Sequence, residues 1–320
     1  PFFQAFHKAM SQRVSPGKGE PDIALLSPGP DHQLYFEHAL LSRYLGYPLV
    51  EGQDLTVRDG EVYQKKLAGL EKVDALFRQI DDMDSDPFAL RRATPYGVAG
   101  LIQVCRDQNI DVINPIGSGF IDTPALRLYL EKLSRELLNQ ELQLASHEGW
   151  WCNTEEGYQR ALQNHSLITP ALDQRVLSGN QDMLSLINET PHKCMVSAPV
   201  DPSLVPSWQA RQIGSGRAIM RFFACATGGG FTVMPGGLAI TSTDVNTLLT
   251  GLPENQHSKD IWVLSEGPVE PFSLMDNFNT IPQIRRSSDL PSRVADNLLW
   301  LGRYLERTEN LIRMLRPVYR

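Results

Sequence analysis

The first half of the chain alternates short apolar runs with amphipathic stretches, and this pattern predicts alternating strands and helices. Apolar runs bounded by turn signals predict strands at 22–27, 48–51, 73–80 and 111–113. Apolar residues at helical spacing predict helices over 35–45 and around 98–105. The first of these ends at Gly46 and carries Phe36, Leu40, Leu41 and Tyr44 on one face. Asp59-Gly60 predicts a hairpin over 55–63. The order is typical of an α/β fold with a parallel-rich sheet.

The second half of the chain has weaker signals for secondary structure. Thr123-Pro124 predicts the start of a helix with leucines at 126, 130, 133 and 137. Polar helices are expected over 154–192, with a turn at Gly179-Asn180, and a loop over 201–217. Strands are expected at 219–226 and 231–234, around a turn at 227–230, and at 261–264. Residues 267–290 indicate a linker, and apolar residues from Val294 to Leu315 at spacings of four and three predict a bundle helix.

Polar residues follow three of the predicted strands. Ligands of parallel sheets bind outside the carboxyl ends of the strands. We therefore expect the loop after Ser27, the acidic run after Ile80 and the loop 114–118 to lie near one another.

An acidic cluster directly follows the strand at 73–80. It comprises Asp81, Asp82, Asp84 and Asp86, with Arg78 just before it. Carboxylate oxygens suit a hard cation such as Mg²⁺. The alternative is a solvated loop, in which Asp is common.

The next strand ends in a second polar group. Asn114, Ser118 and Asp122 could complete a metal site or hold a substrate, whereas the alternative is a turn with a local hydrogen bond. Glu37 and His38 open the helix at 35–45, and a helix N-terminus favours anions. Glu37 there is equally consistent with a complement to the helix dipole.

Charged residues and glycines gather between positions 218 and 264. Arg221, the backbone of Gly236 and Gly237, and Lys259-Asp260 are expected to meet on neighbouring strands. Two cations beside a glycine bend suit a nucleotide phosphate, because glycine lets backbone N–H groups approach closely. An ordinary hairpin with surface charges is the alternative.

Composition narrows the class of partner. The chain has 320 residues and a net charge of −7, which argues against nucleic acid held by phosphate contacts. Its four cysteines form no C-x-x-C pair, and no apolar run is long enough to cross a membrane. Reduced thiols and a cytoplasmic location are expected. The chain begins at Pro1 within a helical pattern and ends after one bundle helix, so a fragment of a longer polypeptide is expected.

Several ordered strings resemble one protein family. They are LLSPGPDHQLYFEHALLSRYLGYPLVEGQDLTVRDGEVY, VDALFRQIDDMDSDPFALR, GVAGLIQVCRDQNIDVINPIGSGFIDTPAL, GWWC, VMPGGLA and SKDIWVL. In this order they resemble the circularly permuted ATP-grasp proteins of the second type, relatives of glutathionylspermidine and glutathione synthetases. DLPSRVADNLLWLGRYLERTENLIRMLR resembles the start of the helical alpha-E domain. The resemblance covers nearly the whole chain outside about 160–215.

The resemblance implies an ATP- and Mg²⁺-dependent ligase that joins a carboxylate to an amine. It implies metal ligation by Asp81, Asp82, Asp86 and Asn114, and catalytic roles for Arg78 and Arg221. Lys259, Asp260, Gly236, Gly237 and Ser118 would hold the nucleotide. The expected domains are a metal-side α/β region (1–150), a nucleotide-side region (151–266), a linker (267–290) and the first alpha-E helix (291–320).

The chain departs from the family pattern mainly on the nucleotide side. Thr169 stands before Pro170 where the family has a basic residue, and 254–257 reads Glu-Asn-Gln-His instead of a glycine-rich run. His32 replaces an Asn, and Gln79 replaces the second Arg before Asp-Asp. A second hypothesis is therefore a catalytically inactive scaffold that binds a protein partner through its helical region.

Overall fold

A computed structural model of the chain describes most of its residues. The described residues are 2–14, 21–92, 94–163, 168–170, 183–198, 200–209, 212–243, 257–265, 267–268 and 291–316. The chain forms two compact units, each discontinuous in sequence. Unit 1 contains residues 1–116, 223–235 and 263–320, and unit 2 contains residues 117–222 and 236–262.

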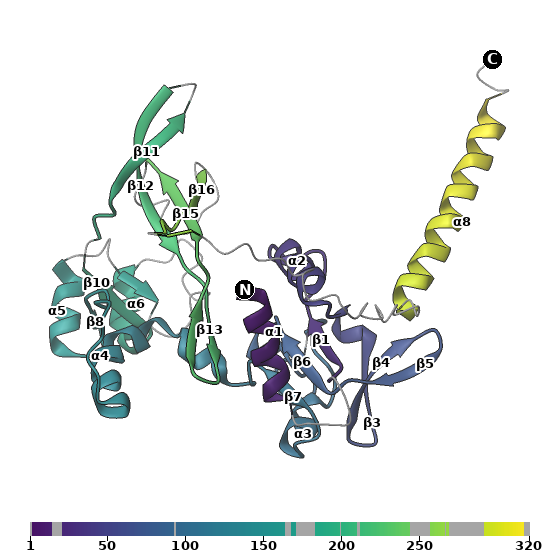
Figure 1. Cartoon of the computed structure of the whole chain (residues 1–320), viewed down its shortest axis with the longest axis horizontal. Coiled ribbons are helices and arrows are strands. Elements are labelled where there is room, and N and C mark those ends of the chain that lie inside the picture. The colour runs from purple at the N-terminus through teal and green to yellow at the C-terminus, as the bar shows by residue number, and fades with distance from the viewer. Residues whose placement is uncertain are drawn as a thin grey trace. The chain divides into compact units, whose positions relative to one another are not determined.

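Unit 1 is built on a four-stranded parallel sheet with the order β2-β1-β6-β7 (Figure 1). These strands are the four that the apolar runs predict: β1 (Ile23–Leu26), β2 (Leu49–Val50), β6 (Ala75–Arg78) and β7 (Asp111–Ile113). In the central pair, Ile23 lies opposite Ala75 and Leu26 opposite Arg78. The predicted α/β class with a parallel-rich sheet is confirmed.

Both faces of this sheet are covered, which explains why its strands are mostly apolar, with charged residues only at the end of β6 and the start of β7. Alternate residues of β1 enter different cores: Ala24 and Leu26 pack with Leu101 and Val104 of α3 (Leu101–Arg106). Ile23 and Leu25 pack on the other face, with Met10 of α1 (Phe2–Arg13) and with Leu45. The parallel sheet is therefore the rigid centre of unit 1.

The helix α2 (Tyr35–Leu45) ends as predicted, at Gly46 with φ 75°. Its predicted apolar face is right only for Leu41, which packs against the core. Phe36 is 83% exposed, and Leu40 and Tyr44 are also exposed. The inward residues are His38, Leu41 and Leu45, which repeat at spacings of three and four. Packing on the sheet selected this face, and it places a histidine in the interior.

A three-stranded antiparallel meander covers part of unit 1. It consists of β3 (Leu55–Arg58), β4 (Glu61–Lys66) and β5 (Gly69–Lys72). The predicted hairpin turn is confirmed, because Asp59 and Gly60 have φ values of 52° and 78°, as a two-residue turn of this type requires.

Unit 2 contains a small antiparallel sheet with the order β8-β10-β9. Its strands are β8 (Gly149–Trp151), β9 (Ile168–Pro170) and β10 (Cys194–Ser197), packed with α5 (Glu155–Gln163) and α6 (Met183–Glu189). β9 corrects the prediction of helices throughout 154–192, and the predicted turn at 179–180 lies outside the described residues. The helix expected after Thr123 changes pitch, from a 3-10 turn (Pro124–Tyr129) through α4 (Leu130–Leu133) to a π-helical turn (Ser134–Leu138).

A second antiparallel sheet of unit 2 has the order β11-β12-β15-β16. Its strands are β11 (Leu204–Gln209), β12 (Gln212–Arg221), β15 (Gly237–Ser242) and β16 (His257–Ile261). The loop predicted at 201–217 is wrong, since β11 and most of β12 occupy it. Pro206 is tolerated because β11 lies at the edge of the sheet. The strand predicted at 261–264 instead begins at His257 and ends at Ile261.

The predicted glycine hairpin is confirmed, but it is shorter than the apolar pattern suggests. β12 ends at Arg221, and a separate pair follows: β13 (Ala224–Thr227) and β14 (Gly230–Val233). The break lies at Phe222-Phe223, where Met234 N–H donates to the carbonyl of Phe223 at 2.8 Å. This hairpin belongs to unit 1 and contacts α1.

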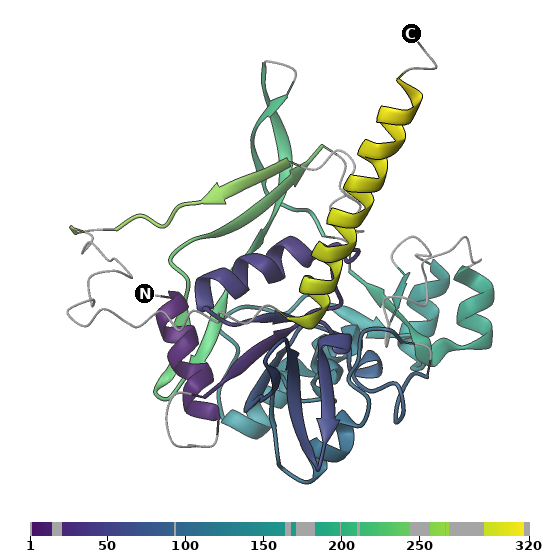
Figure 2. The same cartoon turned by 90° about the vertical axis from the view of Figure 1, so that its right-hand side faces the viewer.

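The predicted C-terminal helix is confirmed as α8 (Ser292–Leu315), one continuous helix in Figure 2. Its apolar seam is exposed, with Leu298, Leu305 and Ile312 each more than half accessible.

No described helix is long and apolar enough to cross a membrane. The predicted linker lies almost entirely outside the described residues. The four sequence domains stay a prediction. The compact units divide the chain differently, with residues 117–150 in unit 2 and residues 223–235 and 263–320 in unit 1.

Gly97 packs against the backbone of the loop that follows β6, and a substitution at this position can test how close that packing is. A Cβ on Gly97 would lie 2.2 Å from the carbonyl oxygen of Asp84 and 2.7 Å from the carbonyl carbon of Ser85. We expect Gly97→Ala to lower the free energy of unfolding by about 1–3 kcal/mol, because backbone atoms must shift. Urea denaturation measures the change.

The control is Gly302→Ala on α8, where nothing lies within 4 Å of an added Cβ. This variant should gain up to about 1 kcal/mol, since alanine favours a helix interior. Equal stability of Gly97→Ala and wild type would contradict the close approach.

Candidate functional site

Arg78 connects two loops at the carboxyl end of the parallel sheet. It is the last residue of β6, and its side chain is only 6% exposed. Its Nε donates to the carbonyl of Asn114 at 3.1 Å and its Nη2 to that of Pro115 at 3.1 Å. Its Nη1 donates to the carbonyl of Ile80. The guanidinium therefore holds the loop after β6 against the loop after β7.

Asp82 completes the environment of this guanidinium. Its Oδ1 lies 2.7 Å from Arg78 Nη2, and its side chain is 21% exposed. Asp81, which precedes it, is exposed. The predicted convergence of the acidic run with the loop at Asn114 is thus present, and Arg78 is what brings the two loops together.

Two other carboxylates of the acidic run serve the fold. Asp86 is 1% exposed, and its oxygens accept from four backbone N–H groups, those of Phe88, Ala89, Gly100 and Ile102, at 2.9–3.3 Å. Asp84 is buried and pairs with Arg91 at 3.0 Å. The contacts of Asp86 favour a structural role over the metal ligation that the sequence suggests.

The remaining oxygen donors fit part of a Mg²⁺ site. In nucleotide sites Mg²⁺ commonly takes one or two protein carboxylates, with phosphate oxygens and waters as the other ligands. Asp81, Asp82 and the exposed Asn114 have this chemistry. Among the described residues, no group of three or more His, Cys, Asp or Glu is placed to hold a metal ion. A Mg²⁺ ion held by Asp81, Asp82 and Asn114 would take its other ligands from phosphate oxygens and water.

The sequence indicates His38 as a candidate at a helix N-terminus, but it does not predict that His38 forms a buried polar pair with Ser27 at the end of β1. Ser27 Oγ lies 3.0 Å from Nδ1 of His38, and both side chains are buried. Burial, and secondarily His32, whose ring stacks on His38 at 5.9 Å, lowers the pKa of His38 below its ordinary value. The helical spacing of His38 with Leu41 and Leu45 was the signal that this histidine faces inward.

The other candidates of this region differ in exposure. Glu37 is exposed at the first turn of α2, and Asp122 is exposed at the end of a 3-10 turn (Ser118–Asp122). Ser118 is half-buried and belongs to unit 2. None of these three has the combination of contacts that surrounds Arg78.

The expected phosphate-side residues of unit 2 lie on neighbouring strands, but they do not share one face. The register places Arg221 opposite Leu238 and Leu238 opposite Asp260. Lys259 pairs with Ala239, one position along, so its side chain leaves the opposite face of the sheet. It donates to the carbonyl of Pro206. The sequence-based expectation that both cations converge is therefore corrected.

Gly236 and Gly237 also have a structural role, because a side chain at either position would lie close to the backbone of a neighbouring strand. A Cβ on Gly237 would lie 2.6 Å from the carbonyl oxygen of Arg221, and one on Gly236 3.3 Å from that of Ile261. Gly237 thus permits β12, β15 and β16 to approach closely. Thr169, at the position where the family has a basic residue, lies on β9 opposite Met195.

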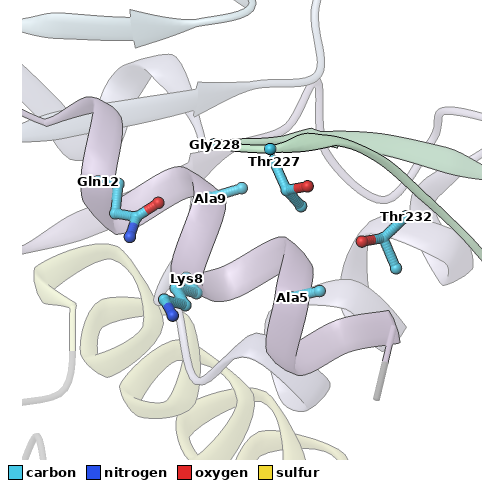
Figure 3. A pocket seen from close by; sticks show the side chains of 8 residues that line it. Ala5, Lys8, Ala9, Gln12, Thr227, Gly228 and Thr232 are labelled. Carbon is cyan, nitrogen blue, oxygen red and sulfur yellow. The ribbon is translucent and has the colours of Figure 1, made fainter.

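A pocket of about 370 Å³ lies between α1 and the β13–β14 hairpin (Figure 3). Its lining is mixed, with the polar Lys8 and Gln12 beside two alanines of α1 on one side and the Gly228-Gly229 turn on the other. Lys8 and Gln12 are exposed, and none of the predicted site residues, all of which are described, lines this pocket. We assign it no ligand.

Comparison with known families identifies the class of the protein. The family "Circularly permuted ATP-grasp type 2" matches residues 1–242, about three quarters of the chain. The chain therefore belongs to the circularly permuted ATP-grasp type 2 family. Residues 290–320 match Alpha-E, described as a predicted alpha-helical domain with a conserved ER motif. Both resemblances drawn from the sequence are confirmed.

The chain is also similar to uncharacterized bacterial proteins. One from Mycobacterium tuberculosis (strain ATCC 25618 / H37Rv) is 30% identical over 335 residues, covering 98% of this chain and 37% of the relative. One from Mycobacterium leprae is 28% identical, covering 81% and 48%. One from Synechocystis sp. is 28% identical, covering 78% and 54%. The chain thus spans about a third to a half of these relatives' lengths.

His38 should make stability depend on pH. Folding lowers the pKa of His38 below its ordinary value of 6.5. Just below pH 6.5, His38 is therefore protonated more often in the unfolded chain than in the folded chain. The free energy of unfolding should therefore fall as the pH decreases through this value. Urea denaturation between pH 7.5 and 5.5 measures the slope, which should flatten in His38→Asn. The exposed His147→Asn is the control; a slope unchanged in His38→Asn would assign the effect elsewhere.

Arg78 should be required for stability. Arg78→Met leaves three carbonyls and the Asp82 carboxylate without their donor, so we expect a loss of about 3–5 kcal/mol in the free energy of unfolding. Arg78→Lys should recover only part, because an ammonium cannot copy the guanidinium fork. Chemical denaturation compares both with Arg221→Met, an exposed position expected within about 0.5 kcal/mol of wild type. A small loss for Arg78→Met would show that the two loops do not depend on it.

Proposed function

We propose that the chain is the ATP-grasp part of an ATP- and Mg²⁺-dependent ligase that joins a carboxylate to an amine. The observation that carries the proposal is the bridge from Arg78 to the carbonyls of Asn114 and Pro115, which brings the acidic run beside Asn114. Family membership supports it, because ATP-grasp proteins generally use ATP and Mg²⁺.

On the metal side, we propose Asp81 and Asp82 as the protein ligands of Mg²⁺, with the side-chain amide oxygen of Asn114 beside them. Asp81 is exposed and can meet a metal–phosphate complex. Arg78 already uses most of its N–H groups on the protein, so we propose it as the residue that positions these ligands.

On the nucleotide side, we propose the sheet face that carries Arg221 and Asp260. These residues lie in one row across β12, β15 and β16, and Arg221 is exposed. A guanidinium on such a face suits phosphate oxygens. Lys259 lies on the other face, so we propose that it supports β11 through Pro206. Ser118, Gly236 and Gly237 stay predictions for the same ligand.

The reaction follows from the pairing of ATP with a carboxylate. Transfer of the terminal phosphate of ATP to the carboxylate gives an acyl phosphate and ADP, and an amine then displaces inorganic phosphate from the acyl phosphate to leave an amide. Cations and metal ligands stabilise the charge on the transferring phosphate, so no protein nucleophile is required. We expect small-molecule substrates and a cytoplasmic setting.

A second candidate is a catalytically inactive scaffold that recruits a protein partner. It is favoured by Thr169, which offers no charge to a phosphate, and by the exposed leucines of α8. The two proposals differ in whether nucleotide binds at all.

Nucleotide binding should stabilise the folded chain. At about 100-fold excess over the dissociation constant, Mg²⁺-ATP should add about 2.7 kcal/mol and raise the melting temperature by several degrees. The shift should largely disappear in Asp81→Asn and in Asp82→Asn. Differential scanning fluorimetry with and without Mg²⁺ measures it.

Asp107→Asn is the matched control, because Asp107 caps the end of α3 and bonds Gln103. Asp107→Asn should keep the full rise in melting temperature with Mg²⁺-ATP. No shift in wild type at millimolar Mg²⁺-ATP would sink the ligase proposal and favour the scaffold. A shift that survives in both aspartate variants would refute the metal assignment.

A further inference from the structure

The first turn of α8 is held by a charged clamp. Arg293 donates through Nε and Nη2 to the two oxygens of Asp54, at 2.9 and 3.0 Å. The same Nη2 lies 3.0 Å from Glu51 Oε1. Asp54 is 2% exposed, so the pair is shielded from water on its acidic side. Bidentate guanidinium–carboxylate pairs are strong and fix orientation as well as distance.

Glu51 extends this clamp toward the ligand end of the sheet. It follows β2, and its carboxylate packs on Gly29, where a Cβ would lie 3.1 Å from Glu51 Cδ. Gly29 has φ 103°, so another residue would be strained here. Gly29 N–H donates to Ser27 Oγ at 3.3 Å, and Ser27 in turn contacts His38. A continuous chain of contacts thus runs from Arg293 to the loop after β1.

The rest of α8 contributes little to this attachment. Beyond its first turn the described part of the helix is exposed, and Pro291, just before it, forms a bridge with Lys66. Within unit 1, α8 extends away from the sheets beyond this first turn (Figures 1 and 2). Among the described contacts, a displacement of α8 therefore acts on the rest of unit 1 through Arg293 and through the Pro291–Lys66 bridge.

We infer that Arg293 is a positioning residue: through Glu51 it holds the loop 27–30 in place and so couples the helical segment to the ligand end of the parallel sheet. The inference rests on the proposed function only for the identity of the ligand. A force that moves α8, such as a partner on its apolar seam, would change the order of this loop.

Hydrogen–deuterium exchange of the full chain tests the coupling without any ligand. In Arg293→Met, amides of residues 27–38 should exchange on the order of tenfold faster than in wild type, although they lie far from 293 in sequence. Glu51→Gln should have the same effect on 27–38 while keeping the Arg293–Asp54 pair, and so the attachment of α8. Arg293→Lys should be intermediate, since Lys lacks the fork. Arg313→Met, an exposed position of the same helix, is the control and should exchange as wild type.

Faster exchange confined to 291–316, with 27–38 unchanged in both Arg293→Met and Glu51→Gln, would overturn the inference. A second experiment measures the affinity for Mg²⁺-ATP by calorimetry. Arg293→Met should weaken the binding of Mg²⁺-ATP several-fold, and Arg313→Met should not. If the wild type fails to bind Mg²⁺-ATP, the proposed identity of the ligand is wrong. The exchange experiment still tests the coupling between α8 and the loop 27–30, because it uses no ligand.

Discussion

The buried guanidinium of Arg78 is the constraint on which the ligand end of unit 1 depends. A charge at the end of a buried strand is costly unless its donors are all engaged. Here the acceptors are carbonyls from the loops after β6 and β7, together with Asp82. Satisfying one buried charge therefore fixes the path of both loops. The positions of Asp81 and Asn114 follow from it.

Burial divides the acidic residues of unit 1 into two groups. Asp54, Asp84 and Asp86 are buried, and each is engaged by an arginine or by backbone N–H groups. Their oxygens stabilise the fold and are shielded from a ligand. Asp81 and Asp82 retain contact with solvent. The resemblance drawn from the sequence implied metal ligation by Asp86 as well, and the burial of Asp86 separates it from Asp81 and Asp82.

The helical segment raises a different physical question, because α8 exposes its apolar seam while its first turn is tied to the sheet by Arg293. The attachment consists of one arginine paired with two carboxylates and of a short backbone bridge, so it covers only a small area and fixes the orientation of the first turn. It can transmit a change in the helix to the loop after β1 without a large interface. This property would serve either of the two proposed functions.

The sequence by itself determined the elements whose signals are local. The apolar strands of the parallel sheet, the Asp59-Gly60 turn and α8 follow from spacing and turn chemistry, and the ordered motifs carried the family. Tertiary structure alone decided which face of α2 is buried, that 201–217 forms strands, and that Lys259 and Arg221 leave opposite faces. It also paired Arg293 with Asp54, 239 residues apart. Register and long-range pairing depend on the whole fold, because shifting a strand by one residue reverses every side chain.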